Sequence, residues 1–160
     1  MATSFASATG TPEVGNVATP INSSAVARTY INNLPAYRAG LSPFSRGLEV
    51  GIAHGYWFYG PFALLGPLRN TDYSSVAGAL AAVSFVFILT VAIAIYSATN
   101  PDGPESTLTT PNPPESYATR EGWSNFASGF FIGGCGGAVF AFLLTQSPHL
   151  LPLQEIFGGM

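Results

Sequence analysis

The sequence predicts an all-α integral membrane protein with three transmembrane helices, an extended N-terminal arm and a proline-rich loop between the second and third helices. Its 160 residues are 48% hydrophobic and only 8% charged, and the mean hydropathy is +0.33. Because soluble domains carry about 25% charged residues, five arginines, eight acids and no lysine cannot cover a water-facing surface. Three apolar segments each approach the roughly 20 residues that a helix needs to cross a bilayer.

The first predicted helix covers residues 43–67. Ser42 stands directly before a proline, which is typical of a hydroxyl N-cap followed by proline at the first helical position. Apart from one arginine and one glutamate near its start, the segment contains no Asp, Glu, Lys or Arg. Gly60-Pro61 interrupts it, so we expect a kink or early unwinding there, and Gly66-Pro67 should end the helix.

The second and third predicted helices cover residues 75–98 and 123–146, and both are strongly apolar. Trp123 stands at the start of the third helix, where an interfacial aromatic residue is common. Residues 68–74 form a short polar loop between the first two helices. Residues 99–122 hold several prolines and join the second helix to the third, so we expect an extended connection.

The two ends of the chain flank these helices. Residues 1–42 are rich in Ser, Thr, Ala, Asn and Gly and lack the basic start and apolar core of a secretory signal, so we expect an extended arm. Residues 147–160 form a tail in which His149 is expected at a membrane edge or subunit contact. Four of the five arginines accompany the arm and the second loop, against Arg69 alone in the first loop. The positive-inside rule therefore places the arm on the cytoplasmic or an equivalent face.

Glu49 and His54 are the main candidate site residues, because an ionisable group in a membrane span is costly and marks a functional site by default. Five residues along an α-helix correspond to about 500°, so the two side chains diverge by about 140° and cannot bind one ion. Two single-ligand sites remain. A magnesium porphyrin fits this pattern, because the macrocycle supplies four nitrogens and the protein one axial donor. Gly51 and Gly55 would clear the helix surface for the ring.

Each feature also has a structural alternative. His54 could hydrogen-bond across a helix bundle, and Glu49 could pair with Arg46 about one turn earlier. Glycines at four-residue spacing favour close helix packing as well as pigment clearance, and they occur in both the first and third helices: Gly47, Gly51, Gly55 and Gly129, Gly133, Gly137. The sequence does not separate these interpretations.

Other functions find less support in the sequence. Asn70 and Asp72 are weak calcium candidates, because polar residues in a turn more often serve the turn itself. The net charge of −3 without a basic patch argues against nucleic-acid binding, and Cys135, the single cysteine, excludes an intrachain disulfide. No catalytic triad or phosphate-binding loop is arranged here, so we do not expect an enzyme. A transporter or channel subunit and a pigment-free scaffold remain alternatives to pigment binding.

Six short motifs occur in order along the chain: Asn33-Leu-Pro-Ala-Tyr-Arg38, Gly40-Leu-Ser-Pro43, Arg46-Gly-Leu-Glu-Val-Gly51, Ala53-His-Gly-Tyr56, Gly66-Pro-Leu-Arg69 and Glu121-Gly-Trp123. Together they closely resemble the photosystem I reaction centre subunit XI (subunit L) family, from about Pro20 through the third helix. Since no transit peptide precedes them, we expect a member of the cyanobacterial type.

The resemblance implies a three-helix subunit of the thylakoid membrane, with its arm on the cytoplasmic or stromal side and its tail in the lumen. It implies antenna chlorophylls, with Glu49 and His54 as axial magnesium ligands, together with β-carotene. It implies contacts with the large reaction-centre subunits, small membrane subunits, lipid and other copies of the same subunit, which join photosystem I into trimers or tetramers.

One departure from the family bears on this assembly. In trimer-forming relatives an aspartate implicated in calcium binding follows Gly-Pro-Leu-Arg, and here that position is Asn70. Because the loss of a carboxylate weakens a calcium site, calcium and the usual trimer both find less support here, and a trimer, a tetramer and a dimer all stay open.

Overall fold

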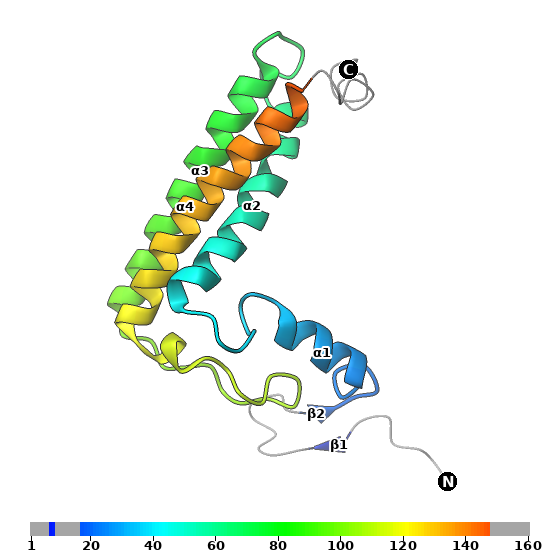
Figure 1. Cartoon of the computed structure of the whole chain (residues 1–160), viewed down its shortest axis with the longest axis vertical. Coiled ribbons are helices and arrows are strands. Elements are labelled where there is room, and N and C mark those ends of the chain that lie inside the picture. The colour runs from blue at the N-terminus through cyan, green and yellow to red at the C-terminus, as the bar shows by residue number, and fades with distance from the viewer. Residues whose placement is uncertain (1–6, 9–16, 148–160) are drawn as a thin grey trace.

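Three long helices lie side by side in the structure, a computed structural model that describes residues 7–8 and 17–147 (Figure 1). They are α2 (Pro43–Leu65), α3 (Ser74–Ala98) and α4 (Arg120–Thr145). α2 and α4 run in the same direction and α3 runs in the opposite one. The short loop after α2 and the end of α4 therefore lie at one end of the bundle. The described part of the arm and the connection from α3 to α4 lie at the other end.

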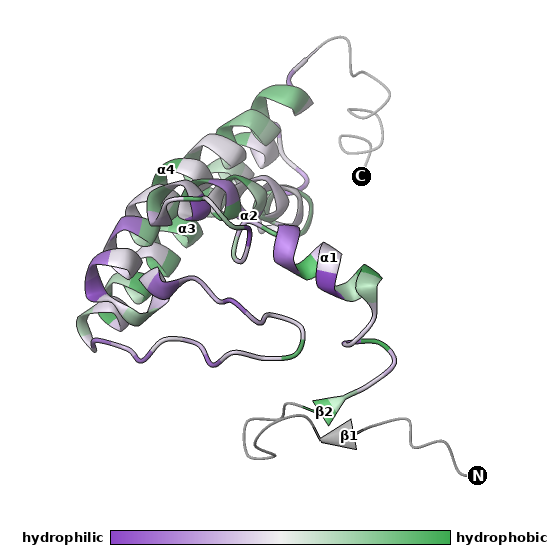
Figure 2. Cartoon of the chain, turned by 60° about the horizontal axis from the view of Figure 1, so that its bottom comes forward, coloured by the Kyte–Doolittle hydropathy of each residue, from purple (hydrophilic) through white to green (hydrophobic). Residues whose placement is uncertain are grey.

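Two helices in the described part of the chain, α3 and α4, are long and apolar enough to cross a membrane. α2 does not reach the same hydropathy, because it contains Arg46, Glu49 and His54 as well as tyrosine and tryptophan rings. Its 23 residues nonetheless extend about 35 Å at 1.5 Å per residue, which matches a hydrocarbon core of about 30 Å. Figure 2 shows hydrophobic residues along the bundle and hydrophilic ones prominent in the helix outside it.

Of the kink or early unwinding expected at Gly60-Pro61, the unwinding is wrong, since α2 continues through Pro61 and ends at Leu65, and the kink stays a prediction. Proline removes one intrahelical hydrogen bond, but a helix that packs closely against its neighbours can tolerate this loss. Tyr59 and Ala63, on either side of the proline, are both buried in the bundle. Their packing holds this last part of α2 helical.

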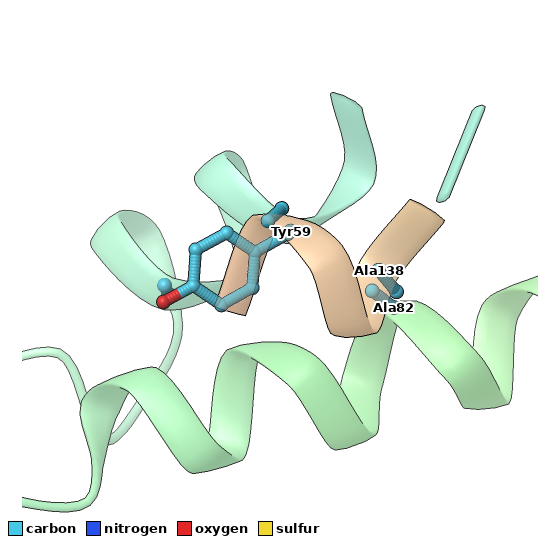
Figure 3. Packing of buried hydrophobic residues seen from close by; sticks show 5 residues of the cluster. Tyr59, Ala82 and Ala138 are labelled. Carbon is cyan, nitrogen blue, oxygen red and sulfur yellow. The ribbon is translucent and has the colours of Figure 1, made fainter. Parts of the chain in front are cut away.

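The bundle core consists largely of small residues with one tyrosine among them. Tyr59 from α2, Ala82 from α3 and Ala138 from α4 come together in Figure 3, and the two alanines are fully buried. The Tyr59 hydroxyl lies 2.6 Å from the hydroxyl oxygen of Thr145, so the ring also links the ends of α2 and α4 through a hydrogen bond. A second cluster of buried residues comprises Val86, Tyr117, Phe126 and Phe130.

Two facing rows of glycines bring α2 and α4 into backbone contact. A Cβ atom on Gly51 would overlap the carbonyl of Phe130, and one on Gly133 would overlap the carbonyl of Leu48. The other members of both rows are equally crowded, and we call the six together the glycine seam: Gly47, Gly51, Gly55, Gly129, Gly133 and Gly137. The helix-packing interpretation of both repeats is confirmed.

The proposed pigment clearance by Gly51 and Gly55 is correspondingly wrong. The backbone of α4, around Phe130 and Gly134, already occupies the surface that these two glycines leave open. A ligand ring beside α2 therefore has to lie on another face of the helix.

The N-terminal arm was expected to be extended, but part of it is helical. Residues Ala25–Asn33 form α1, at whose start the Ser24 hydroxyl accepts a hydrogen bond from the amide of Ala27 at 3.1 Å. This N-cap satisfies a donor that would otherwise lack an intrahelical partner. Further towards the N-terminus, β1 (Ser7–Ala8) pairs antiparallel with β2 (Val17–Ala18).

The connection from α3 to α4 is tied to the arm by hydrogen bonds. The Asn32 side-chain amide of α1 donates to the carbonyl of Thr109 at 2.7 Å. A short 3-10 helix, η2 (Glu115–Ala118), then leads into α4, and the Tyr117 hydroxyl donates to the carbonyl of Ala36 at 2.9 Å. Burial raises the pKa of the Tyr117 phenol, which favours the protonated form that donates this bond.

Candidate functional site

His54 lies on an exposed face of α2, with its ring nitrogen Nδ1 2.7 Å from the carbonyl oxygen of Val50. Since a carbonyl oxygen only accepts hydrogen bonds, this contact places a proton on Nδ1, and the neutral imidazole then has its lone pair on Nε2. Among the described residues Nε2 has no hydrogen-bond partner. The imidazole thus forms its hydrogen bond within α2. The alternative of a hydrogen bond across the bundle is wrong for the described residues.

An apolar hollow of about 430 Å³ opens beside His54, and we call it the His54 hollow. The rings of Phe130 and Phe58 meet the imidazole edge-on, at centroid distances of 5.5 and 5.7 Å. The hollow is lined by residues of α2, α3 and α4: Val50, His54, Leu89, Ala92, Ile93, Tyr96, Phe126 and Phe130. Of these, only His54 and Tyr96 carry a polar side-chain group. The imidazole therefore faces a space suited to a large hydrophobic ligand.

Glu49 forms an ion pair with Arg38 of the arm, through Oε1 of the carboxylate. Both side chains are about one-third exposed. The expected pairing with Arg46 is wrong, because the Arg46 side chain is buried and donates through Nη1 to the carbonyl of Pro35 at 2.9 Å. Gly40, with a φ of +80°, lies between the two arginines in a turn that returns the arm to α2.

Glu49 and His54, the two predicted ligand residues, have separate surroundings, in agreement with the angle between them around the helix axis. Glu49 contacts the arm, whereas His54 faces the hollow between the three long helices. Within the ranges that the structure describes, no group of three or more His, Cys, Asp or Glu side chains is placed to hold a metal ion. Each candidate can therefore offer one donor to a ligand that completes its own coordination.

The remaining candidates are less informative. Asn70 and Asp72 are exposed in the loop after α2, and their calcium site stays a prediction. His149 lies outside the described residues. Two residues of the candidate sites escaped the sequence reasoning, namely Arg38 beside Glu49 and Tyr96 beside His54. Tyr96 carried one signal that was available, since it is a hydroxyl-bearing ring within an apolar segment.

Comparison with known proteins identifies relatives over almost the whole chain. The family model described as Photosystem I reaction centre subunit XI matches residues 5–150. A protein named Photosystem I reaction center subunit XI from Synechococcus elongatus is 57% identical, across 94% of this chain and 92% of its own. Proteins of the same name from Picosynechococcus sp. and Crocosphaera subtropica are 61% and 55% identical, across 83% and 93% of this chain and 88% and 96% of their own.

Proposed function

The chain belongs to the family of photosystem I reaction centre subunit XI, and we propose that it binds antenna chlorophylls and carotenoid and joins copies of photosystem I. As a photosystem I subunit it belongs to the thylakoid membrane and associates with other subunits of that complex. Its relatives are named as subunits of the complex and not as enzymes. The pigments, the number of membrane passes and the assembly of copies are the proposal.

The environment of His54 is the observation that carries the pigment proposal. Chlorophyll magnesium requires one axial donor from the protein, and Nε2 has a lone pair because Nδ1 donates to Val50. The hollow beside it is lined almost wholly by aliphatic and phenylalanine side chains, which suit a flat apolar macrocycle. Chlorophyll bound there would absorb light and pass excitation to neighbouring pigments.

Glu49 supports a second, separate site. Arg38 engages Oε1, and the other carboxylate oxygen has no hydrogen bond in the described part of the chain, so Oε2 can act as an oxygen donor to magnesium. The arginine also offsets the negative charge, which lowers the cost of placing a carboxylate at the edge of the membrane. A chlorophyll at Glu49 and a chlorophyll at His54 would lie on different faces of α2.

The packing of α2 supports three membrane passes. The glycine seam holds α2 along α4, which is long and apolar enough to span a membrane, so α2 crosses beside it. Four arginines lie at the α1 end of the bundle: Arg28 in α1, Arg38 between α1 and α2, Arg46 near the start of α2 and Arg120 at the start of α4. Arg69 lies in the loop at the opposite end. The positive-inside rule then places the arm on the cytoplasmic or stromal side and the tail in the lumen.

The outer surface of the bundle is suited to lipid, carotenoid and neighbouring subunits. α3 carries exposed large apolar side chains along its length: Val76, Leu80, Phe87, Ile88, Val91 and Ile95. We propose that this surface meets lipid and membrane partners, among them the large reaction-centre subunits, small membrane subunits and further copies of this chain in a trimer or tetramer. Asn70 and Asp72 are also proposed as calcium ligands, with less support than the chlorophyll ligands because Asn70 has no carboxylate.

Substitution of the two ligands in the intact complex tests the pigment proposal. His54→Leu should remove one chlorophyll per complex and the absorption band of that pigment, because leucine offers no lone pair. Glu49→Leu should remove another, whereas Glu49→Gln keeps an oxygen donor and should retain it. Immunodetection of the subunit in each complex controls for assembly. Unchanged pigment content and spectrum in an assembled His54→Leu complex would contradict the proposal.

A further inference from the structure

The His54 hollow contains one polar side chain besides the imidazole, the phenol of Tyr96 near the end of α3. Tyr96 is 46% exposed, and its ring meets the Trp123 ring at right angles with 5.0 Å between the centroids. In the part of the chain that the structure describes, the Tyr96 hydroxyl has no hydrogen-bond partner. The hydroxyl is therefore a donor that is free to serve a ligand.

Tyr96 also lines a second hollow of about 350 Å³, together with Tyr37 of the arm, Tyr117 of η2 and Trp123. The two hollows share Val50, Tyr96 and Phe126. Tyr96 thus borders both hollows, and the second hollow lies at the end of the bundle where η2 leads into α4. A ring ligated by His54 that extends towards this end would bring its rim to the phenol.

The chemistry of the ligand matches these two polar groups. A chlorophyll presents a central magnesium, which accepts a lone pair, and carbonyl oxygens on the ring rim, which accept hydrogen bonds. A carbonyl without a donor is costly in a hydrocarbon environment, and tyrosine combines an apolar ring with a donor at one tip. His54 supplies the lone pair, and Tyr96 is the one hydrogen-bond donor among the other side chains that line its hollow.

We propose that the Tyr96 hydroxyl donates a hydrogen bond to a rim carbonyl of the chlorophyll that His54 ligates. This inference rests on the proposed function of His54. A single axial ligand leaves the ring free to rotate about the metal–nitrogen bond, whereas a second contact at the rim defines its orientation. Tyr96 is thus a positioning residue. Because a hydrogen bond to a conjugated carbonyl stabilises the excited state, Tyr96 also tunes the absorption of this pigment.

Tyr96→Phe in intact photosystem I tests the inference, since phenylalanine keeps the ring packed against Trp123 and removes only the hydroxyl. We expect an unchanged number of chlorophylls per complex. One carbonyl stretching band should move to the higher frequency of a free carbonyl, and the absorption band that His54→Leu removes should shift to shorter wavelength. Tyr73→Phe is the matched control, because exposed Tyr73 precedes the opposite end of α3 and lines neither hollow.

The outcomes separate the two proposals. If His54→Leu removes one chlorophyll and Tyr96→Phe leaves every carbonyl band in place, the hydrogen bond from Tyr96 is wrong and the ligand role of His54 stands. If an assembled His54→Leu complex keeps all of its chlorophyll, the proposed function of His54 is wrong, and the inference about Tyr96 is overturned with it.

Discussion

Two faces of α2 differ in how they meet the rest of the bundle. On one face the glycine seam brings α2 so close to α4 that a single Cβ atom would overlap the opposite backbone. On the other face, Val50 and His54 border a hollow of about 430 Å³. His54 and Gly55 are adjacent in sequence but lie about 100° apart around the helix. His54 therefore borders the hollow, while Gly55 lies in the glycine seam.

This difference gives α2 one face that is held rigidly and another face with open space beside it. The seam fixes the rotation and depth of α2 against α4, because small residues allow extensive backbone contact. Since the rotation is fixed, the direction of the His54 side chain is fixed as well. The proposed ligand would then lie in the hollow that α2, α3 and α4 line together.

The largest expected effect is on the closed face. Gly51→Val would place a branched side chain against the carbonyl of Phe130 and the amide of Gly134, which are backbone atoms that cannot move aside. We expect a loss of stability above about 3 kcal/mol, at or beyond the upper end for overpacked cores. Thermal unfolding and the amount of subunit retained in the membrane measure it.

Gly60→Ala is the matched control on the same helix, since a Cβ at that position meets open space. It should unfold at or slightly above the temperature of the unaltered protein, because alanine favours helix over glycine. Equal tolerance of Gly51→Val and Gly60→Ala would mean that the seam is not closely packed.

A smaller effect is expected where α3 meets the bundle. Val86 is fully buried and reaches into the space left by Gly134. Val86→Ala should leave a small cavity and reduce the unfolding free energy by about 2 kcal/mol. Val91→Ala, at an exposed position of the same helix, should change it by less than about 0.5 kcal/mol. Similar losses at both positions would show that α3 has no defined packed face.

The hydrogen bond between Tyr59 and Thr145 comes next in size. Tyr59→Phe keeps the ring in the core and removes the hydroxyl that lies 2.6 Å from Thr145. Because hydrogen bonds between transmembrane helices contribute modestly, we expect a loss of about 0.6 kcal/mol in unfolding free energy. Denaturant titration of the purified complex checks it, and a loss as large as that of Val86→Ala would contradict this ranking.

The smallest effect concerns the ion pair on the arm. Arg38 and Glu49 are both about one-third exposed, and exposed ion pairs contribute about 0–1 kcal/mol. Arg38→Gln should lower stability by about 0.5 kcal/mol, and the difference should shrink at high salt as screening increases. Arg28→Gln, which removes no ion pair among the described residues, provides the control. A difference independent of salt would show that the pair acts by packing and not by charge.

The long helices were predictable from the sequence because local chemistry determines them. Apolar segments of sufficient length and a Ser42–Pro43 start predicted α2, and Ser42 does accept a hydrogen bond from the Ser45 amide at 3.1 Å. α1 was missed although Ser24 offered a visible N-cap, because nine residues are too few for a helix to be stable alone and its bond to Thr109 comes from a distant part of the chain.

The candidate site was predictable only in part. Helical geometry separated Glu49 from His54, but it could not supply the partner of Glu49, since Arg38 returns to α2 through the turn at Gly40. The glycine repeats were visible, yet their role depended on the register between two helices. The position of Tyr96 beside His54 depends in the same way on how α3 packs against α2.

A density map of intact photosystem I at side-chain resolution tests most directly whether the closed seam places a pigment on the open face of α2. We predict a chlorophyll ring in the hollow between α2, α3 and α4, with its magnesium at coordination distance from Nε2 of His54, and unbroken contact along the glycine seam. Nε2 hydrogen-bonded to a protein group, with the hollow filled by side chains or lipid, would contradict this arrangement.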